Sequence, residues 1–346
     1  MSLKHVAALA GVSAKTVSNV VNGYVHVTEA TRTRVQHAID ELHYRPNLAA
    51  RQLRQGRSGV IALALPALDL PYFAELARSV ITYAEDRGWT VLIDQTDGLV
   101  DREQLVLDGF RGQQIDGLIF SPISVGAEDL EQRRDPTPLV LLGERVFDGP
   151  ADHVAIDNVA AARTATQHLI ALGRRRIAAI GDQPRPTSET AHLRLRGYQE
   201  ALAEAGLPRR PEGVVEVENY HRPDGASAMR RLLELCDPPD AVFCFNDLLA
   251  LGALREVYDH DVRVPDDLAV VGWDDIEEGR YSTPTLTTIS PDKSRIAALA
   301  VDFLAARLSA GSEPPHEVTA PFTLAVREST TGRPVTRHSA GVGPSA

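Results

Sequence analysis

The N-terminal region carries small polar side chains at helical spacing, directly after a glycine. Residues 11–22 read Gly-Val-Ser-Ala-Lys-Thr-Val-Ser-Asn-Val-Val-Asn. On a helix face, alanine can contact a thymine methyl group, lysine can donate to guanine or phosphate, and asparagine can pair with adenine. The alternative is a solvated helix face, but the turn, the cap and the valine spacing together favour base recognition. The side chains predicted to contact nucleic acid here are Ser13, Ala14, Lys15, Thr16, Ser18, Asn19, Asn22 and His26.

Three helices are expected to position this polar face. Apolar residues recur at helical spacing over residues 3–10, which indicates a first helix. Gly11 permits a tight turn, and Ser13 can cap a second helix whose buried stripe consists of the valines in 17–21. A third helix is expected over residues 28–42. This order predicts a helix-turn-helix, in which the second helix lies in the major groove of DNA.

Charge separates this head from the rest of the chain. Residues 1–57 hold eight basic and three acidic side chains, a net charge of +5, whereas the whole chain carries −11. The remainder therefore carries −16. A basic head on an acidic body indicates that only the head meets a polyphosphate partner, here double-stranded DNA.

Further motifs extend this pattern along the chain. The most specific are Leu3-Lys4-His5-Val6-Ala7, Val12-Ser13-x-x-Thr16-Val17-Ser18-x-Val20-x-Asn22 and Tyr44-Arg45-Pro46-Asn47-x-x-Ala50-Arg51-x-Leu53. Others are Ile156-Asp157-Asn158, Asn246-Asp247-x-x-Ala250-x-Gly252, Val271-Gly272-Trp273-Asp274-Asp275 and Pro284-x-Leu286-Thr287-Thr288-Ile289. Over roughly residues 2–330 the chain resembles the lactose-repressor/galactose-repressor (LacI/GalR) family of bacterial transcription factors.

Residues 46–57 are interpreted as a hinge. Pro46 and Asn47 can start a helix, but only about eight residues follow before Gly56, too few for a stable isolated helix. The resemblance implies that two hinge helices fold together in the minor groove, where paired Leu53 side chains wedge open a base step. The alternative is a leucine that packs within its own dimer. The hinge residues predicted to contact DNA are Asn47, Ala50, Arg51 and Leu53.

From residue 59 onward, short apolar runs alternate with amphipathic helices. The expected strands are Val60–Leu65, Thr90–Asp94, Ile115–Phe120, Leu139–Leu142, Ile177–Ile180, Ala241–Phe245 and Leu268–Val271, and the clearest helices are Tyr72–Arg87, Asn158–Leu172 and Leu195–Ala205. This alternation is typical of βαβ units around parallel sheets, and about 270 residues are enough for two lobes. The resemblance implies a two-lobed periplasmic-binding-protein-like fold with a ligand cleft between the lobes.

The predicted organisation is therefore an all-α helix-turn-helix head followed by an α/β effector domain. The head covers residues 1–45, the hinge 46–57, and the ligand-binding and dimerisation domain 58–330. Its N-lobe is expected at about 58–157 and 290–318, and its C-lobe at about 158–289 and 319–330. Residues 331–346 are rich in glycine, proline and serine and are expected to be disordered.

Catalytic and metal-binding signatures are missing from the sequence. There is no G-x-G-x-x-G, P-loop, H-E-x-x-H or G-x-S-x-G motif, and the eleven histidines have no metal-ligand spacing. Cys236 and Cys244 are interpreted as reduced packing residues, which is consistent with the cytoplasm. No signal peptide or membrane-spanning run is recognisable. We therefore expect no enzyme, no cofactor and no metal site.

The resemblance supplies most of the candidate effector contacts. They are Tyr72, Phe73, Glu144, Arg194, Tyr220, Asn246 and Asp274. Arginine, aspartate and asparagine beside an aromatic plate suit a polyol, which favours a carbohydrate over a purine base. Asn246 or Asp247 can instead cap a helix, and Tyr220 can be a solvated loop residue. Many relatives carry an aspartate after the strand at 139–142, where this chain has Gly143-Glu144-Arg145.

These features predict a ligand-controlled repressor that binds a near-palindromic operator. The C-terminal segment has no leucine heptads, so a homodimer is favoured over a tetramer. Closure of the lobes on a small molecule would change the spacing of the two hinges. Alternatives are an effector other than a sugar, such as a nucleobase acting as co-repressor, and a stand-alone solute-binding protein. An α/β enzyme would need a nucleophile, metal or cofactor motif.

Overall fold

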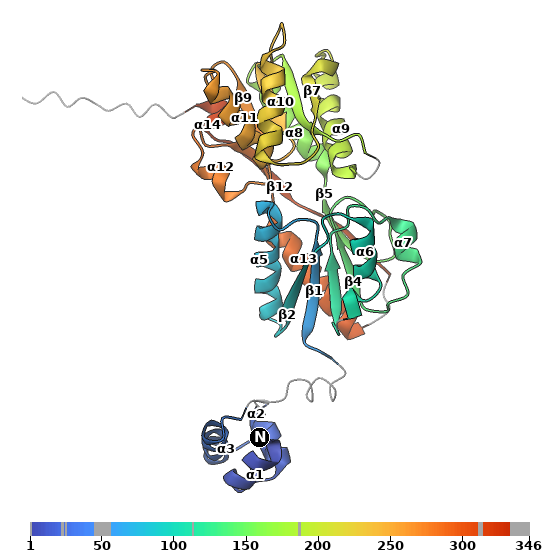
Figure 1. Ribbon diagram of the computed structural model, residues 1–346, viewed down its shortest axis with the longest axis vertical. Coiled ribbons are helices and arrows are strands. Elements are labelled where there is room, and N and C mark those ends of the chain that lie inside the picture. Colours follow the sequence, from blue (N-terminus) through green and yellow to red (C-terminus); the bar gives the residue numbers. More distant parts are fainter. Residues whose placement is uncertain are drawn as a thin grey trace, which may run out of the picture. The chain divides into compact units, whose positions relative to one another are not determined.

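The computed structural model describes residues 2–21, 24, 26–44, 57–112, 114–185, 188–310 and 314–332. The chain divides into two compact units, Met1–Ser58 and Gly59–Ala346 (Figure 1). Asn22 and the expected hinge contacts Asn47, Ala50, Arg51 and Leu53 lie outside the described residues, as does the expected tail from residue 333 onward.

The first unit is helical throughout its described part. Its helices are α1 (Leu3–Ala10), α2 (Ala14–Val21) and α3 (Glu29–Glu41). Val6, Val17 and Val35 are fully buried, one from each helix, and form the centre of a small core. Because the apolar faces point inward, α2 presents its polar side chains outward.

The turn between α1 and α2 follows from two residues. Gly11 ends α1 with φ at 65°, in the left-handed region that favours glycine. The Ser13 hydroxyl accepts a hydrogen bond from the backbone N–H of Thr16 at 3.1 Å, so Ser13 caps α2 as the sequence predicts.

The second unit contains two sheets, each of six strands within the described residues (Figure 1). The first sheet has the order β11-β5-β4-β3-β1-β2 and is parallel throughout. Its strands are β1 (Val60–Leu65), β2 (Thr90–Gln95), β3 (Gly117–Phe120), β4 (Leu139–Leu142), β5 (Asp152–Ile156) and β11 (Glu317–Ala320). Its helices are α5 (Pro71–Glu85), α6 (Val100–Leu107), α7 (Ala127–Glu131) and α13 (Lys293–Ala310), with a 3₁₀ turn at Phe110–Gly112.

The second sheet has the order β12-β10-β9-β8-β6-β7, and only its edge strand β12 is antiparallel to its neighbour among the described strands. Its strands are β6 (Ile177–Asp182), β7 (Val214–Glu216), β8 (Ala241–Cys244), β9 (Ala269–Trp273), β10 (Thr287–Pro291) and β12 (Phe322–Ala325). Its helices are α8 (Asn158–Ala171), α9 (Glu189–Glu204), α10 (Arg222–Leu233), α11 (Asp247–Asp259), α12 (Glu277–Tyr281) and α14 (Glu328–Thr331), with a 3₁₀ turn at Pro211–Gly213.

The chain passes between the two lobes three times. It leaves the first sheet after β5, returns after β10, and passes again between β11 and β12, where Pro321 alone separates the two strands. The second and third crossings lie about two residues later than expected from the sequence, because β10 continues to Pro291 and β11 to Ala320.

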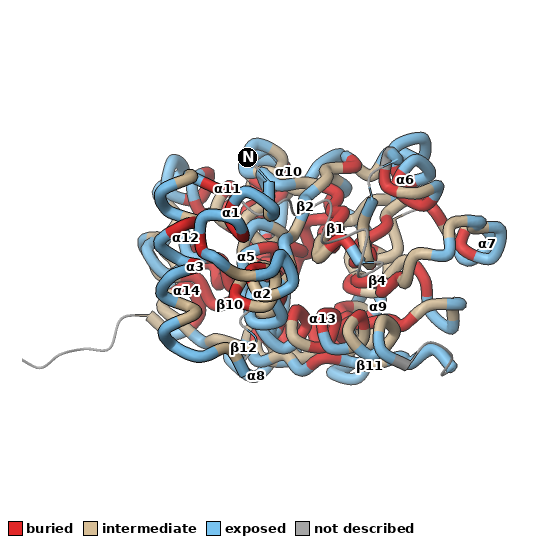
Figure 2. Tube along the Cα trace, turned by 90° about the horizontal axis from the view of Figure 1, so that it is seen from below, coloured by how far each residue is buried: buried red, intermediate tan, exposed pale blue. Residues whose placement is uncertain are grey.

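Burial is concentrated on the strands and on the helix faces that cover them, while the outer helix faces are exposed (Figure 2). Helix α9 begins at Glu189, six residues before the expected start at Leu195. The segment before Leu195 is mostly polar, so apolar spacing did not reveal it as part of the helix. None of the described helices is long and apolar enough to cross a membrane. Cys236 is exposed and Cys244 is buried, and both are free thiols.

Candidate ligand cavity and nucleic-acid interface

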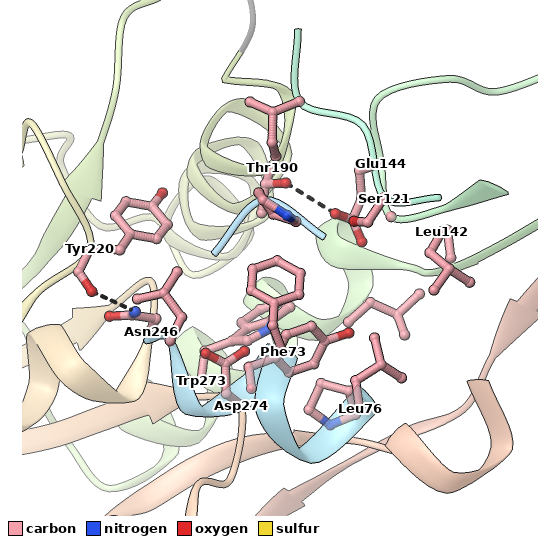
Figure 3. Close-up of a pocket in the computed structure, with 18 of the residues that line it drawn as sticks. Phe73, Leu76, Ser121, Leu142, Glu144, Thr190, Tyr220, Asn246, Trp273 and Asp274 are labelled. Atoms are coloured by element: carbon pink, nitrogen blue, oxygen red, sulfur yellow. Dashed lines mark hydrogen bonds between the residues drawn. The ribbon is translucent and has the colours of Figure 1, made fainter. Parts of the chain in front are cut away.

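A cavity of about 220 Å³ lies between the two lobes, at the ends of the strands (Figure 3). The N-lobe contributes the start of α5 and the loops after β1, β3 and β4. The C-lobe contributes the start of α9 and the ends of β8 and β9. All seven residues proposed as effector contacts line it: Tyr72, Phe73, Glu144, Arg194, Tyr220, Asn246 and Asp274. Parallel sheets commonly bind ligands beyond the carboxyl ends of their strands.

Arg194 is held in place by neighbouring residues of the C-lobe. Its Nε donates to Asn158 Oδ1 at 2.8 Å, its Nη1 donates to the carbonyl of Phe245, and its guanidinium lies 3.9 Å from the ring centroid of Trp273. Within the described part of the chain, its Nη2 group has no hydrogen-bond partner. Arg194 is 7% exposed as a residue and lines the cavity, so this group is a preorganised donor there.

Asp274 supplies the complementary acceptor. It follows β9 with φ at 113°, and its backbone is held by the carbonyl of Ile289 at 2.9 Å and by Lys293 Nζ. Its carboxylate accepts no hydrogen bond from the described residues. Burial raises the pKa of this carboxyl to about 7, against the opposing effects of Arg194 and Lys293. A buried carboxyl on a strained backbone, with no hydrogen bond from the described residues, is typical of a binding site.

The structure separates the roles of two neighbouring polar residues. Asn246 caps α11, accepting from Leu249 N–H at 2.8 Å and donating to the carbonyl of Tyr220 at 3.0 Å (Figure 3). Asp247 is fully buried, does not line the cavity, and accepts from the Thr288 hydroxyl at 2.6 Å. Burial raises the pKa of Asp247 well above its ordinary value. The helix-capping alternative therefore applies to Asn246, which also lines the cavity.

Aromatic rings form part of the cavity wall. Tyr72 and Phe73 pack edge to face at 5.2 Å between ring centroids. The Tyr220 hydroxyl donates to the carbonyl of Gly181 at 2.7 Å, so Tyr220 is not the solvated loop residue that the sequence left open. Burial raises the pKa of both tyrosines, which therefore stay neutral and present flat apolar faces.

Glu144 connects the two lobes. Its Oε2 accepts a hydrogen bond at 3.0 Å from the hydroxyl of Thr190, at the start of α9 (Figure 3). Thr190 was missed from the sequence, and so were Ser121, Gln183 and Trp273, which also line the cavity. Trp273 is the last residue of the buried strand β9 and belongs to the Val-Gly-Trp-Asp-Asp motif, but hydrophobicity alone does not distinguish a core position from a cavity wall.

The candidate nucleic-acid interface is the outer face of α2. Ala14 and Lys15 are exposed, and Ser18 and Asn19 are partly exposed. The hydroxyls of Ser13 and Thr16 lie 2.9 Å apart and satisfy each other at the helix start. His26 is exposed in the loop before α3, with its ring edge-on to Tyr24 at 5.4 Å. Small side chains on a rigid core are the form that a groove-reading helix requires.

No group of three or more histidine, cysteine, aspartate or glutamate side chains in the described ranges is arranged to hold a metal ion.

Two families match separate parts of the chain. Residues 2–47 match the bacterial regulatory proteins of the lacI family, and residues 166–330 match the periplasmic binding protein-like domain. The ribose operon repressor of Escherichia coli K12 is 36% identical over 311 residues, covering 89% of this chain and 93% of that protein. The transcriptional repressor PurR of Aliivibrio salmonicida is 32% identical over 309 residues, covering 89% and 92%.

Solved structures show the same architecture. A putative LacI-family regulator from Sanguibacter keddieii has 46% identity and a TM-score of 0.73, covering 80% of this chain and 100% of that one. The Lac repressor dimer bound to operator has 29% identity and a TM-score of 0.83, covering 95% and 99%. The helical head and the two-sheet α/β domain predicted from the sequence are confirmed. The chain belongs to the lacI family of bacterial regulatory proteins.

Proposed function

We propose that this protein is a cytoplasmic transcriptional repressor, without enzymatic activity, that binds a near-palindromic operator as a homodimer. Its operator affinity is set by a small sugar bound in the cavity between the lobes. The observation that carries this proposal is a pair of groups that line the cavity and lack hydrogen bonds to the described residues: the Nη2 group of the clamped Arg194 and the carboxyl of Asp274. A hydroxyl group can accept from the first and donate to the second.

The cavity favours a single sugar ring. Its volume of about 220 Å³ is below the range of roughly 300–1,000 Å³ that holds drug-sized ligands. The aromatic faces of Tyr72 and Phe73 offer apolar contact beside the polar groups. The similarity to the ribose operon repressor supports this ligand class. A solved regulator described as a CelR–cellobiose complex, which has 32% identity, a TM-score of 0.69 and covers 95% of this chain, supports a carbohydrate in general, although its disaccharide has one ring more than the ligand proposed here.

The proposed DNA contacts divide into two groups. Ala14, Lys15 and Asn19 on α2 read bases or phosphates in the major groove, while the hinge around Leu53 orders in the minor groove. If Leu53 wedges open a base step, Leu53→Ala weakens binding to the operator much more than binding to random DNA. Equal losses on both DNAs would exclude the wedge.

Two measurements test the proposal. The full-length protein selects its site from a random duplex library, and fluorescence anisotropy then compares the selected site with scrambled DNA at several salt concentrations. Calorimetry measures binding of D-ribose, D-glucose, D-galactose, cellobiose and guanine. We expect steep salt dependence, tight binding of the selected site, and a shift of operator affinity by about 5–150-fold with one monosaccharide. Failure to distinguish the selected site from scrambled DNA would overturn the repressor function.

A nucleobase is the second candidate effector. The edge-to-face pair of Tyr72 and Phe73 can cover a planar ring, and the PurR relatives are as similar in coverage as the ribose operon repressor. Binding of guanine, with increased operator affinity and no response to the sugars, would favour this alternative and a co-repressor mode.

A further inference from the structure

The turn that carries Glu144 is attached to strand β5 through both backbone groups of Gly143. The Gly143 N–H donates to the carbonyl of Val154 at 3.2 Å, and Nε2 of His153 lies 2.5 Å from the Gly143 carbonyl oxygen. Gly143 has φ at 87°, so the turn needs the left-handed conformation that glycine adopts. The direction in which the chain leaves this turn sets where the next residue, Glu144, projects.

His153 makes this contact from inside the protein. Its side chain is 2% exposed, and the ring packs edge-on against Phe147 at 5.0 Å between centroids. A carbonyl oxygen only accepts, so Nε2 carries the hydrogen that is donated to Gly143. Within the described residues, Nδ1 has no hydrogen-bond partner and lies 3.8 Å from Glu317 Oε2. Among the described residues, the bond to Gly143 is therefore the hydrogen bond that this buried ring makes.

The carboxylate of Glu144, the residue after this turn, lies at the cleft between the lobes. Glu144 accepts from the Thr190 hydroxyl of the opposite lobe at 3.0 Å. Its charge also contributes to raising the pKa values of Tyr72 and Asp274, after the larger effect of burial. Glu144 thus faces the same interior as the polar groups of the C-lobe while it joins the lobes.

We propose that His153 is a positioning residue: through the Gly143 carbonyl it fixes Glu144 at the cleft, where the carboxylate joins the two lobes and limits which ligand fits beside Asp274. This inference rests on the proposed effector site for its ligand-selecting consequence. An apolar side chain could fill the same space, but it could not donate a hydrogen bond to the Gly143 carbonyl. His153 acts only through Glu144 and does not itself line the cavity.

A double-mutant cycle on the full-length protein, without any effector, tests this. Thermal unfolding is measured for His153→Leu, Thr190→Val and the double variant. If His153 positions Glu144 for Thr190, the second substitution has little further effect once the first is made, and the changes in Tm fall short of additivity by about 2 °C. Additive changes would assign His153 to packing alone and overturn the proposal.

Two comparisons make the cycle specific. Thr166→Val is the matched control. Thr166 is a buried threonine of the C-lobe, and its hydroxyl donates to the Ala162 carbonyl of its own helix at 2.9 Å. The changes in Tm in its cycle with His153→Leu must therefore be additive. His153→Gln can still donate to Gly143 and is expected to restore the coupling to Thr190. Hydrogen exchange over residues 143–147 should accelerate by about 10-fold in His153→Leu and stay near wild type in His153→Gln. Equal exchange in both variants would contradict the proposal, even if Leu lowers stability.

These measurements separate the inference from the proposed function. The coupling is measured without effector, so an absence of sugar binding would contradict the proposed function and leave the coupling result standing. Additive changes in Tm in the cycle, together with normal binding of D-ribose or D-glucose, would overturn the role of His153 and leave the proposed function standing.

Discussion

The head and the cavity solve recognition in opposite ways. The outer face of α2 is one continuous helix surface, whose polar side chains are exposed or partly exposed above a core centred on Val6, Val17 and Val35. The cavity is assembled from several distant segments, its polar groups are buried or partly buried, and some are held by their neighbours, as Arg194 is by Asn158 and Trp273. A surface that meets a large charged partner needs shape and exposure, whereas a small ligand needs groups that are already desolvated and fixed.

This contrast predicts that changes in one region leave the function of the other intact in isolated binding measurements. The largest effect is expected for Arg194→Ala, which removes the preorganised donor from the cavity. Hydrogen bonds to charged groups contribute about 1.5–3 kcal/mol, so affinity for the bound sugar should fall about 100-fold in calorimetry. Operator binding without sugar should be unchanged. The control is Arg196→Ala on the same helix, where the arginine is exposed and pairs with Glu200 at 2.8 Å. Equal losses of sugar affinity in Arg194→Ala and Arg196→Ala would contradict the role of Arg194 as a fixed donor in the cavity.

The converse experiment is Asn19→Ala on α2. A bidentate base contact contributes about 1–3 kcal/mol, so if Asn19 pairs with adenine, affinity for the selected site should fall by about 5–150-fold, with little change on scrambled DNA. Sugar binding should be unaffected. Lys4→Ala, an exposed change on α1, serves as control. A loss of equal size on selected and scrambled DNA would show that Asn19 does not read bases.

A pH experiment sharpens the account of the cavity. Burial raises the pKa of Asp274 from 3.8 to about 7, so the folded state holds this proton more tightly than the unfolded state. Stability contributed by the protonated carboxyl is therefore lost as pH rises from about 4 to 7. Asp274→Asn should flatten this part of the Tm profile. Because the ionised carboxylate is the better acceptor, wild-type sugar affinity should also rise up to about 10-fold between pH 6 and 8. If neither the Tm nor the sugar affinity of the wild-type protein changed with pH over these ranges, the role of Asp274 would be excluded.

The smallest effect is expected at the aromatic wall. Tyr220→Phe keeps the ring face but removes the hydroxyl that donates to Gly181. One such hydrogen bond contributes about 0.5–1.5 kcal/mol, so a modest fall in Tm with a change in sugar affinity below about 3-fold is expected. A large loss of affinity with unchanged Tm would show that the hydroxyl itself contacts the ligand.

The same contrast explains what the sequence could predict. The head is local: Gly11, Ser13 and the valines of α2 determine a turn, a cap and a buried face within a dozen residues. The apolar strands of the body were also recognisable, since runs such as Val60–Leu65 are buried on both faces. Strand β5 was missed because it begins with Asp152 and His153, polar side chains that are buried with specific partners.

The cavity was predictable only through resemblance. Arg194 and Asp274 are 80 residues apart, and no periodicity links them. The contact from Glu144 to Thr190 depends on a left-handed glycine and on a histidine in another strand, so no local pattern could reveal it. Long-range pairing of polar groups is decided by tertiary structure, after the elements have formed.

The single residue between β11 and β12 has a kinetic consequence. Since Pro321 alone joins strands of two different sheets, that connection has no slack to lengthen when the lobes separate. Opening must come from rotation about a few backbone torsions at the three crossings, as in other hinged proteins. If a ligand leaves the cavity only when the lobes open, it can exchange only as often as this rotation occurs. Its association and dissociation rates are then governed by the crossings, while its equilibrium affinity is governed by the cavity.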